Sequence, residues 1–309
     1  MLKKLAPYFY LARLHSLAGV FLLLLPSYWS LALNSRLKDS LKKLNVGNLG
    51  EQLETFASLL NKADFYREIY YYLIFLIGAI CMRSFGCVIN DIADRNVDKL
   101  VARTKNRPLA ANLLSIKQAL IWSSLLLIFP ILIFLQFNNF AKLVALLSLI
   151  FLFVYPFTKR FFQAPQLVLG LTFNFGILLA DAVVNHQISY GSWLLYLAAI
   201  FWTLAYDTIY AYQDYKDDKI NHIKSLAVLL GEKPKPFIAF FYLMMVGIII
   251  SLGLLKAFNV LFFILLSLGL LKILYALYKL NLTKPTQCFA FFKLNIYLSI
   301  IIWIAFLLG

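Results

Sequence analysis

The sequence contains two short clusters of acidic side chains, each at the end of a long apolar stretch. The first cluster reads NDIADRNVD and the second reads YDTIYAYQDYKDD. On a helix, with about 100° of rotation per residue, the first cluster and a preceding arginine fall within an arc of roughly 100°. These residues are Arg83, Asn90, Asp91, Asp94 and Asp98. The second cluster falls within roughly 40° if its helix continues that far. Its residues are Asp207, Asp214 and Asp218.

Both clusters are typical of cation sites. Carboxylates 5–6 Å apart repel each other by roughly 3 kcal/mol at an effective dielectric constant near 20, so facing clusters require a cation between them. Oxygen ligands without neighbouring histidine or cysteine favour a hard ion, and Mg²⁺ commonly binds a few carboxylates together with phosphate oxygens. We therefore expect Mg²⁺ and a diphosphate group. Nearby basic side chains are suited to the remaining phosphate oxygens. They are Arg103, Lys105, Arg107, Lys159 and Arg160.

Each of these features has a simpler alternative. A single DxxD at a membrane edge is commonly a solvated loop, and the excess of cytoplasmic basic residues in membrane proteins is sufficient to explain Lys159 and Arg160. Arg83 is different, because it lies about two turns inside an apolar stretch, where a charge is costly unless it faces a polar cavity or a partner. We expect Arg83 to bind an anionic organic group. The alternative is a structural ion pair, for which Asn174 and Asp181 are candidates.

These side chains must be positioned by membrane helices. The chain has 309 residues, of which 62% are hydrophobic and 14% charged, a composition far from that of a soluble domain. Nine apolar stretches approach the roughly 20 residues that a membrane-spanning helix needs. They cover about 16–33, 68–90, 117–136, 138–157, 165–185, 190–213, 236–256, 257–280 and 288–308. We expect an all-α polytopic membrane protein with one domain over residues 1–309. Its bundle of about nine transmembrane helices should surround a central cavity open to the cytoplasmic side.

The distribution of charge predicts the orientation. The net charge is +15, and most of the 29 Lys and Arg fall in connections on the same side as the N-terminus, which the positive-inside rule assigns to the cytoplasm. These residues do not gather on one polar face, so we expect no nucleic-acid partner. Residues 34–67 form a polar loop on the far side, either a solvated linker or in part an amphipathic surface helix. The absence of a transit peptide favours a bacterial inner membrane over a mitochondrial one.

Five sequence blocks carry a resemblance to a known family. They read MRSFGCVINDIADRNVD, RTKNRPL, VYPFTKR, PQLVLG and AYDTIYAYQDYKDDKINHIKSLAVLLG, and they cover about residues 80–232. In this order they resemble the UbiA-type intramembrane prenyltransferases, most closely those that prenylate 4-hydroxybenzoate in ubiquinone biosynthesis. The resemblance implies Mg²⁺-dependent transfer of a polyprenyl group, within membrane lipid, from a polyprenyl diphosphate to carbon 3 of 4-hydroxybenzoate, with release of diphosphate.

The resemblance also implies roles for individual residues. Asn90 and Asp94, with Asp91 and Asp98 close by, match the first magnesium motif. Asp214 and Asp218 match the second motif, with Asp207 in support, and among the acids we assign catalytic roles to Asp94, Asp207 and Asp214. Several residues stand where the family binds diphosphate. They are Arg103, Arg107, Tyr155, Lys159 and Tyr210, to which we add Arg160. Arg83 resembles the arginine proposed to bind the carboxylate of the aromatic acceptor.

The sequence departs from the family in three places. It reads RLHSLAG where the family often has an Arg-Pro pair, it carries Asn174 and Asp181 in a usually less polar span, and it has the long 34–67 loop. Other branches of the family, which use homogentisate, a naphthoate or a porphyrin as acceptor, are alternatives. A multi-pass transporter is a further alternative, but it would spread ionisable residues across the membrane, whereas these acids gather at one end.

Overall fold

The structure is a computed structural model that describes residues 2–35, 62–158 and 160–309, and within these residues every regular element is a helix. The helices are α1 (Leu2–Leu11), α2 (Ala18–Leu33), α5 (Lys62–Ala93), α6 (Arg95–Asp98), α7 (Ile116–Leu126), α8 (Ile128–Leu135), α9 (Asn139–Thr158), α10 (Pro165–Phe173), α11 (Phe175–Asn185), α12 (Tyr190–Ala211), α13 (Tyr215–Ile220), α14 (Leu226–Leu230), α15 (Lys235–Leu255), α16 (Val260–Lys279) and α17 (Pro285–Leu308). The all-α fold class is confirmed. Most of the predicted 34–67 loop, including its expected amphipathic helix, lies outside the described residues.

Eight helical stretches in the described parts of the chain are long and apolar enough to cross a membrane, and the protein is an integral membrane protein. The stretches are Phe65–Ala93, Ile116–Leu135, Asn139–Thr158, Pro165–Asn185, Tyr190–Ala211, Lys235–Leu255, Val260–Lys279 and Pro285–Leu308. The remaining predicted span, 16–33, corresponds to α2, which has 16 residues. At 1.5 Å per residue α2 is about 24 Å long, shorter than a hydrocarbon core of roughly 30 Å. The predicted nine spans thus become eight long helices and one shorter apolar helix.

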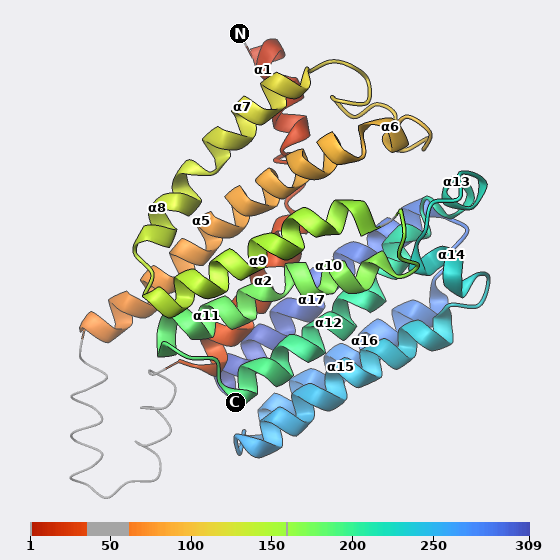
Figure 1. Cartoon of the computed structure of the whole chain (residues 1–309). Helices are drawn as coiled ribbons and strands as arrows, with labels where there is room; N and C mark the ends of the chain where they lie inside the picture. Colours follow the sequence, from red (N-terminus) through yellow and green to blue (C-terminus); the bar gives the residue numbers. More distant parts are fainter. Residues whose placement is uncertain (1, 36–61, 159) are drawn as a thin grey trace, which may run out of the picture.

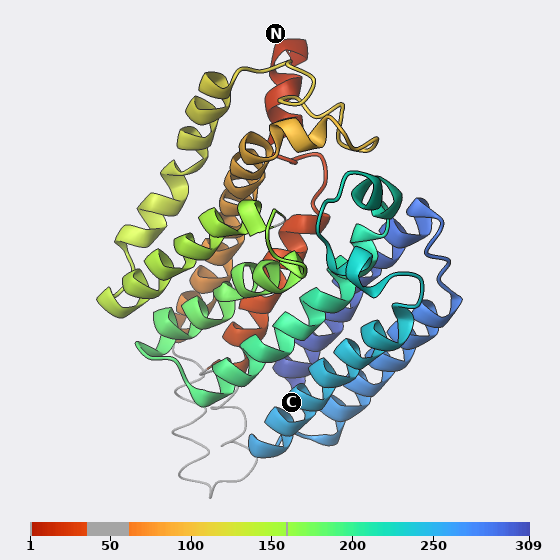
Figure 2. The same ribbon diagram turned by 45° about the vertical axis from the view of Figure 1, so that its right-hand side comes forward.

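Helices α2 and α12 form the centre of the bundle. Helix α2 packs against α5, α11 and α17, and α12 packs against α10, α15 and α17. In the most apolar part of α12, 67% of the residues are buried, compared with 11% in the stretch formed by α7 and α8. Figures 1 and 2 show α7 and α8 on the opposite side of the bundle from α15 and α16. Helices α2 and α12 therefore form the centre of the protein. Helix α8, which is strongly apolar and has no buried residue, lies at the periphery.

Polar side chains connect the central helices. The buried Oδ1 of Asn295, in α17, accepts hydrogen bonds from the Trp202 indole in α12 at 3.0 Å and the Tyr242 hydroxyl in α15 at 2.7 Å. The Trp29 indole in α2 donates to the Ser299 carbonyl at 2.8 Å. Because apolar side chains gain little by leaving lipid for protein, such interhelical hydrogen bonds help to specify how membrane helices pair.

Two membrane helices break at acidic residues. Asp94 separates α5 from α6, and Asp214 directly precedes α13, three residues after α12 ends. Their backbone angles are nearly equal, with φ −92° and ψ 4° at Asp94 and φ −106° and ψ 5° at Asp214. In both cases the carbonyl accepts a 2.8 Å hydrogen bond from the amide four residues later, that of Asp98 or Asp218. Helical spacing had treated each cluster as part of one continuous helix. The structure shows instead that the first cluster is interrupted at Asp94 and the second after Ala211, and that the two clusters share a local geometry.

Both breaks lie at the same end of the molecule. Figure 1 shows α6 and α13 at the upper right of the view, whereas the turns after α11 and α15 lie at the lower left. The fold therefore delivers both acidic clusters to one end of the bundle.

Candidate active site

A cavity of about 1250 Å³ opens between the ends of α5 and α12. Most of the residues predicted to do chemistry line it, and they come from both clusters and from the loop after α6. They are Arg83, Asn90, Asp91, Arg103, Arg107, Tyr155, Asp207, Tyr210, Asp214 and Asp218. The rest of the lining is largely apolar and comes from several helices, with Leu22 of α2, Phe134 of α8, Phe153 of α9 and Phe173 of α10 among its residues. The cavity therefore combines a charged end with an apolar interior.

Arg103 joins the loop after α6 to the end of α12. Its Nε donates to Asp214 Oδ1 at 2.8 Å, its Nη1 donates to the Tyr210 hydroxyl at 3.2 Å, and its guanidinium carbon lies 5.3 Å from the centre of the Tyr210 ring. Burial acts to lower the pKa of Arg103, but the hydrogen bond to Asp214 and the electrostatic attraction to Tyr210, Asp214 and Asp98 together leave the pKa raised. The arginine therefore stays charged where the two halves of the site meet.

A main-chain contact strengthens this junction. The backbone amide of Ala102 donates to Asp217 Oδ2 at 2.8 Å. The sequence did not predict a role for Asp217. Its motif contains three aspartates within five residues, and only the directions in which their side chains point in the folded protein distinguish them. The contact fixes the loop after α6 against α13, so the distance between the two acidic clusters is set by backbone as well as side chains.

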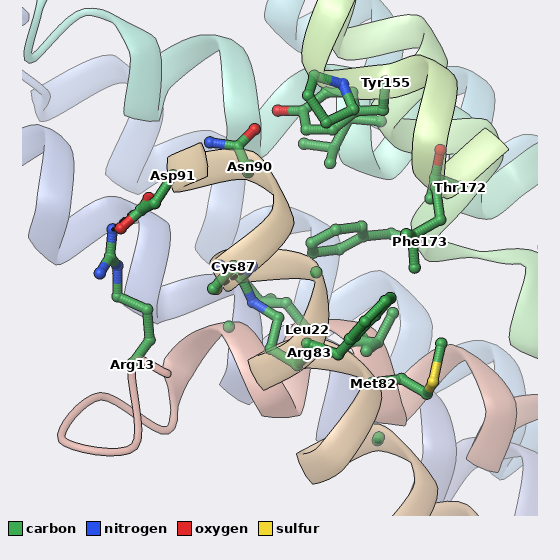
Figure 3. Close-up of a pocket in the computed structure, with 18 of the residues that line it drawn as sticks. Arg13, Leu22, Met82, Arg83, Cys87, Asn90, Asp91, Tyr155, Thr172 and Phe173 are labelled. Carbon is green, nitrogen blue, oxygen red and sulfur yellow. Dashed lines mark hydrogen bonds and ion pairs between the residues drawn. The ribbon is translucent and has the colours of Figure 1, made fainter. Parts of the chain in front are cut away.

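Asp91 is the most enclosed acid of the first cluster, with 1% of its surface exposed. Arg13 Nη2 donates to both carboxylate oxygens at 2.9 Å (Figure 3). Arg107 Nη1 lies 3.1 Å from Oδ1. Arg107 also binds Asp98 Oδ2 at 2.9 Å. Burial acts to lower the pKa of Arg107, but the carboxylates of Asp91 and Asp98 leave it raised. Burial raises the pKa of the Asp98 carboxyl, and Arg107 opposes this rise.

Sequence reasoning did not identify Arg13. It lies in the turn between α1 and α2, 78 residues before Asp91, in the stretch where the sequence departs from the family pattern. Its backbone is left-handed, with φ 55°, a conformation that non-glycine residues rarely adopt and that no local motif here predicts. The strained turn aims the side chain across the cavity mouth toward α5.

Asn90 and Asp94 contact each other within the first cluster. The Asn90 amide nitrogen donates to Asp94 Oδ2 at 3.2 Å. The Asn90 Oδ1 atom is buried and has no hydrogen-bond donor among the residues that the structure describes. Asn90 lines the cavity and points away from Arg13, unlike Asp91 (Figure 3). A buried amide oxygen without a donor, beside a carboxylate, fits a hard cation such as Mg²⁺.

The described residues contain no group of three His, Cys, Asp or Glu side chains close enough to hold a metal ion. Mg²⁺ usually binds through one or two carboxylates together with waters and substrate phosphates. Asp214 and Asp218 line the cavity and supply carboxylates from the other side, whereas Asp94 is buried behind the lining. The donor set therefore fits magnesium bound jointly with a diphosphate.

Arg83 lies deeper in the cavity. Its Nη1 donates to the Cys87 sulfur at 2.8 Å, and its guanidinium carbon lies 5.3 Å from the centre of the Phe173 ring. The candidates for an ion pair with it are engaged elsewhere. Asp181 accepts hydrogen bonds from Asn185 and from the amide and hydroxyl of Ser189, and Asn174 donates to Gly170, Ala199 and Thr203, which fastens the break between α10 and α11 to α12.

Arg160 contacts the end of α5. Arg160 donates to the Ala93 carbonyl at 2.9 Å, and its guanidinium carbon lies 5.2 Å from the centre of the Phe157 ring. It is not among the residues that line the cavity. Lys159, also predicted to bind diphosphate, lies outside the described residues.

The sequence matches one protein family over most of its length. Residues 55–301 match the profile of the UbiA prenyltransferase family. The 4-hydroxybenzoate octaprenyltransferase of Francisella tularensis subsp. novicida (strain U112) is 43% identical over 242 residues, which cover 77% of this chain and 84% of that protein. The 4-hydroxybenzoate octaprenyltransferase of Polynucleobacter asymbioticus is 34% identical over 307 residues, which cover 99% and 97% of the two chains.

Solved structures share the fold. The apo structure of a UbiA homolog from Aeropyrum pernix K1 superposes with a TM-score of 0.68 at 20% identity, covering 93% of this chain and 96% of that one. A UbiA homolog from Archaeoglobus fulgidus bound to GPP and Mg²⁺ superposes with a TM-score of 0.65 at 16% identity, covering 97% and 99%. At these identities the likeness is one of architecture.

Proposed function

The chain belongs to the UbiA prenyltransferase family, and from this premise we propose that it transfers a polyprenyl group from a polyprenyl diphosphate to carbon 3 of 4-hydroxybenzoate, in ubiquinone biosynthesis. The observation that carries the proposal is the meeting of two acidic clusters and three arginines at the charged end of an otherwise apolar cavity. An isoprenoid diphosphate has the same division between a charged head and an apolar chain. The relatives described above carry the name of this activity.

The charged end would bind the diphosphate together with magnesium. Asn90 and Asp94 from one side and Asp214 and Asp218 from the other are the proposed magnesium ligands, with Asp207 in support. Bound Mg²⁺ would stabilise negative charge on the diphosphate as it leaves. A homolog of the same fold holds GPP and Mg²⁺ together.

Asp91 and Asp98, also predicted as magnesium ligands, are already paired with Arg13 and Arg107. We propose that their main task is to hold these arginines at the cavity mouth. The arginines would then face the diphosphate oxygens without swinging into solvent.

Arg103, Arg107, Tyr155 and Tyr210 would bind the diphosphate, and Lys159 and Arg160 remain proposed members of this group. Arg103 is already oriented by Asp214 and Tyr210, so it loses little freedom on binding a phosphate oxygen. When the allylic C–O bond breaks, the diphosphate keeps the bonding electron pair and a carbocation remains. The rings of Tyr155, Tyr206 and Tyr210 line the cavity and would shield this cation from water and stabilise it through their π faces.

The acceptor would lie between this site and Arg83. A carboxylate bound by Arg83 would direct the ring carbon next to the phenol toward the cation. That carbon forms the new C–C bond and then loses its proton, which restores the aromatic ring. Homogentisate, a naphthoate and a porphyrin remain alternative acceptors. The intramembrane position of Arg83 favours a small aromatic acid, because an unpaired charge at that depth requires an anionic partner.

We further propose that the protein lies in a bacterial inner membrane with its N-terminus and its acidic clusters on the cytoplasmic side. The excess of basic residues on that side supports this orientation. The bacterial source of the relatives supports the compartment.

One experiment tests both substrates. Membranes that contain the protein are incubated with 4-hydroxybenzoate and polyprenyl diphosphates of several chain lengths, with Mg²⁺ or with a chelator, and the products are identified by mass spectrometry. We expect a 3-polyprenyl-4-hydroxybenzoate that forms only with Mg²⁺. Product formation that is equal in the chelator, or a product built only on another ring acceptor, would refute the proposal.

A further inference from the structure

Three residues from three helices enclose the guanidinium of Arg83 inside the cavity. Cys87, one turn further along α5, accepts a hydrogen bond from Nη1 at 2.8 Å. The ring of Phe173, at the end of α10, has its centre 5.3 Å from the guanidinium carbon. Gly19, on α2, leaves room for the rest of the group, since a Cβ atom there would lie 2.6 Å from Nε and 2.9 Å from Nη2. Figure 3 shows Arg83 with Cys87 and Phe173 on its two sides.

None of these contacts neutralises the charge of Arg83. A thiol is a weak hydrogen-bond acceptor and a ring face is a weak electrostatic partner, so both orient a guanidinium while leaving most of its charge available. The Arg83 Nε atom is buried and makes no hydrogen bond to any residue that the structure describes. Within residues 2–35, 62–158 and 160–309, the ion pairs of the site involve Arg13, Arg103 and Arg107 instead. The cavity therefore contains an oriented cation that still lacks an anion.

We propose that Gly19, Cys87 and Phe173 are positioning residues that fix the direction of the Arg83 guanidinium and thereby make the enzyme select acceptors that carry a ring carboxylate. This inference rests on the proposed function and deepens it. Gly19 leaves the space beside α2 in which the Arg83 guanidinium lies. Cys87 fixes the position of one Nη atom, and Phe173 fixes the orientation of the guanidinium plane. An acceptor whose carboxylate meets the remaining donors is held with its reactive carbon toward the diphosphate end, whereas a neutral ring gains nothing from Arg83.

Gly19 offers the sharpest perturbation. A methyl group at this position would overlap the guanidinium, which is the far end of a flexible side chain. The side chain of Arg83 can move away more easily than two packed helices can separate, so Gly19→Ala should fold while turning Arg83 out of place. Gly247→Ala is the matched control, because Gly247 lies within α15, is not among the cavity-lining residues, and a Cβ there would meet nothing within 4 Å.

Cys87 offers an independent perturbation. Cys87→Ala removes the acceptor of the Nη1 hydrogen bond, whereas Cys87→Ser replaces the sulfur with an oxygen that accepts the same bond. Cys81→Ala is the matched control, because Cys81 is half-buried and is not among the cavity-lining residues. A merely structural role for Cys87 would not distinguish serine from alanine in the recognition of one substrate.

The test compares 4-hydroxybenzoate with its neutral analogue 4-hydroxybenzamide in purified full-length protein, with the polyprenyl diphosphate saturating. For Gly19→Ala we expect KM for the acid to rise about tenfold, as for a lost hydrogen bond to a charged group. We expect the preference in kcat/KM for acid over amide to fall by a similar factor, and KM for the diphosphate to stay within twofold. Cys87→Ala should show the same pattern at about threefold, Cys87→Ser should restore it, and both controls should match the wild type.

Two results would overturn the proposal alone. One is an unchanged preference for acid over amide in both Gly19→Ala and Cys87→Ala. The other is an equal loss with the acid, the amide and the diphosphate, which would indicate general disruption of the site. A wild-type enzyme that prenylates neither ring compound would overturn the proposed function together with this proposal, so the two failures are distinguishable.

Discussion

Replacing Asp91 with asparagine should destabilise the protein before any substrate or metal binds. Asp91 is almost completely buried and receives Arg13 at two oxygens and Arg107 at one. Both arginine side chains are 21% exposed, so solvent screens the charges only in part. Asparagine has nearly the same shape but no charge, and it would leave two cations facing each other across one amide.

The magnitude follows from these distances. With the charge centres roughly 4 Å apart and an effective dielectric constant near 20, each ion pair contributes a gross attraction of about 4 kcal/mol. Renewed hydration of the arginines offsets part of this loss, and breaking a buried pair by removing one partner typically costs about 3–5 kcal/mol. We take about 3 kcal/mol as the net cost, because Arg107 keeps Asp98. For a chain of this size that is a fall of about 6 °C in the unfolding midpoint, at about 2 °C per kcal/mol.

The assay measures thermal unfolding of the detergent-solubilised protein in the presence of a chelator, for wild type, Asp91→Asn, Arg13→Met and the double variant. The double-mutant cycle isolates the Arg13–Asp91 pair from other effects of each change. We expect a coupling free energy of about 1–3 kcal/mol, within the range known for contacting residues.

A midpoint for Asp91→Asn that equals the wild type in the chelator, together with a coupling near zero, would refute this reasoning. Asp91 would then matter only when metal is present, as a ligand. A midpoint that differs from the wild type only after Mg²⁺ and diphosphate are added would lead to the same conclusion.

Further predictions concern the site and the core. Asp94→Asn and Asp214→Asn should each reduce prenyl transfer in washed membranes at least a hundredfold at saturating Mg²⁺, since each removes a proposed magnesium ligand. The amount of folded protein should stay near wild type by fluorescence-detected gel filtration. Near-normal turnover would count against the magnesium assignment. Arg83→Ala should raise KM for the aromatic acid and leave KM for the diphosphate unchanged, and equal KM values for the acid in both proteins would remove its proposed role. Asn295→Leu should lower unfolding stability by about 1–3 kcal/mol, because two buried donors lose their acceptor, yet leave turnover per folded molecule unchanged; a selective loss of activity without a change in melting temperature would contradict this.

The parts of the fold that were predictable depend on local rules. Apolar stretches of about 20 residues located the membrane helices, because bilayer thickness and helical rise fix that length. The same rules predicted a span over 16–33, whereas α2 covers Ala18–Leu33 and is two residues shorter at its N-terminal end. Helix α2 packs against α5, α11 and α17, and sequence hydropathy does not report on such contacts.

In the site, Asn90, Asp91, Asp214 and Asp218 line one cavity. Asp94 and Asp98, which helical spacing put on the same face as Asn90, are not among the lining residues. Helical spacing did not predict the ion-pair partners of these acids, because the partners come from distant segments of the chain. Arg13 reaches Asp91 only through a left-handed turn, and the pairing of Arg103 with Asp214 depends on how a loop folds back. Arg160 carries the right charge in the right motif, yet it binds a helix-end carbonyl. Residue type and spacing predicted what could react, and tertiary geometry decided what each group touches.

The junction between the loop and α13 also bears on how this site can vary among related sequences. At position 102 the contact with Asp217 uses the peptide N–H, a group that every amino acid except proline carries. The exposed alanine side chain takes no part in that bond. We therefore expect the amino acid at this position to vary among related sequences while the backbone hydrogen bond is kept. We expect proline to be the one residue missing at this position among related sequences. Because the other substitutions keep the backbone hydrogen bond, sequence conservation alone would not reveal that this residue connects the loop to α13.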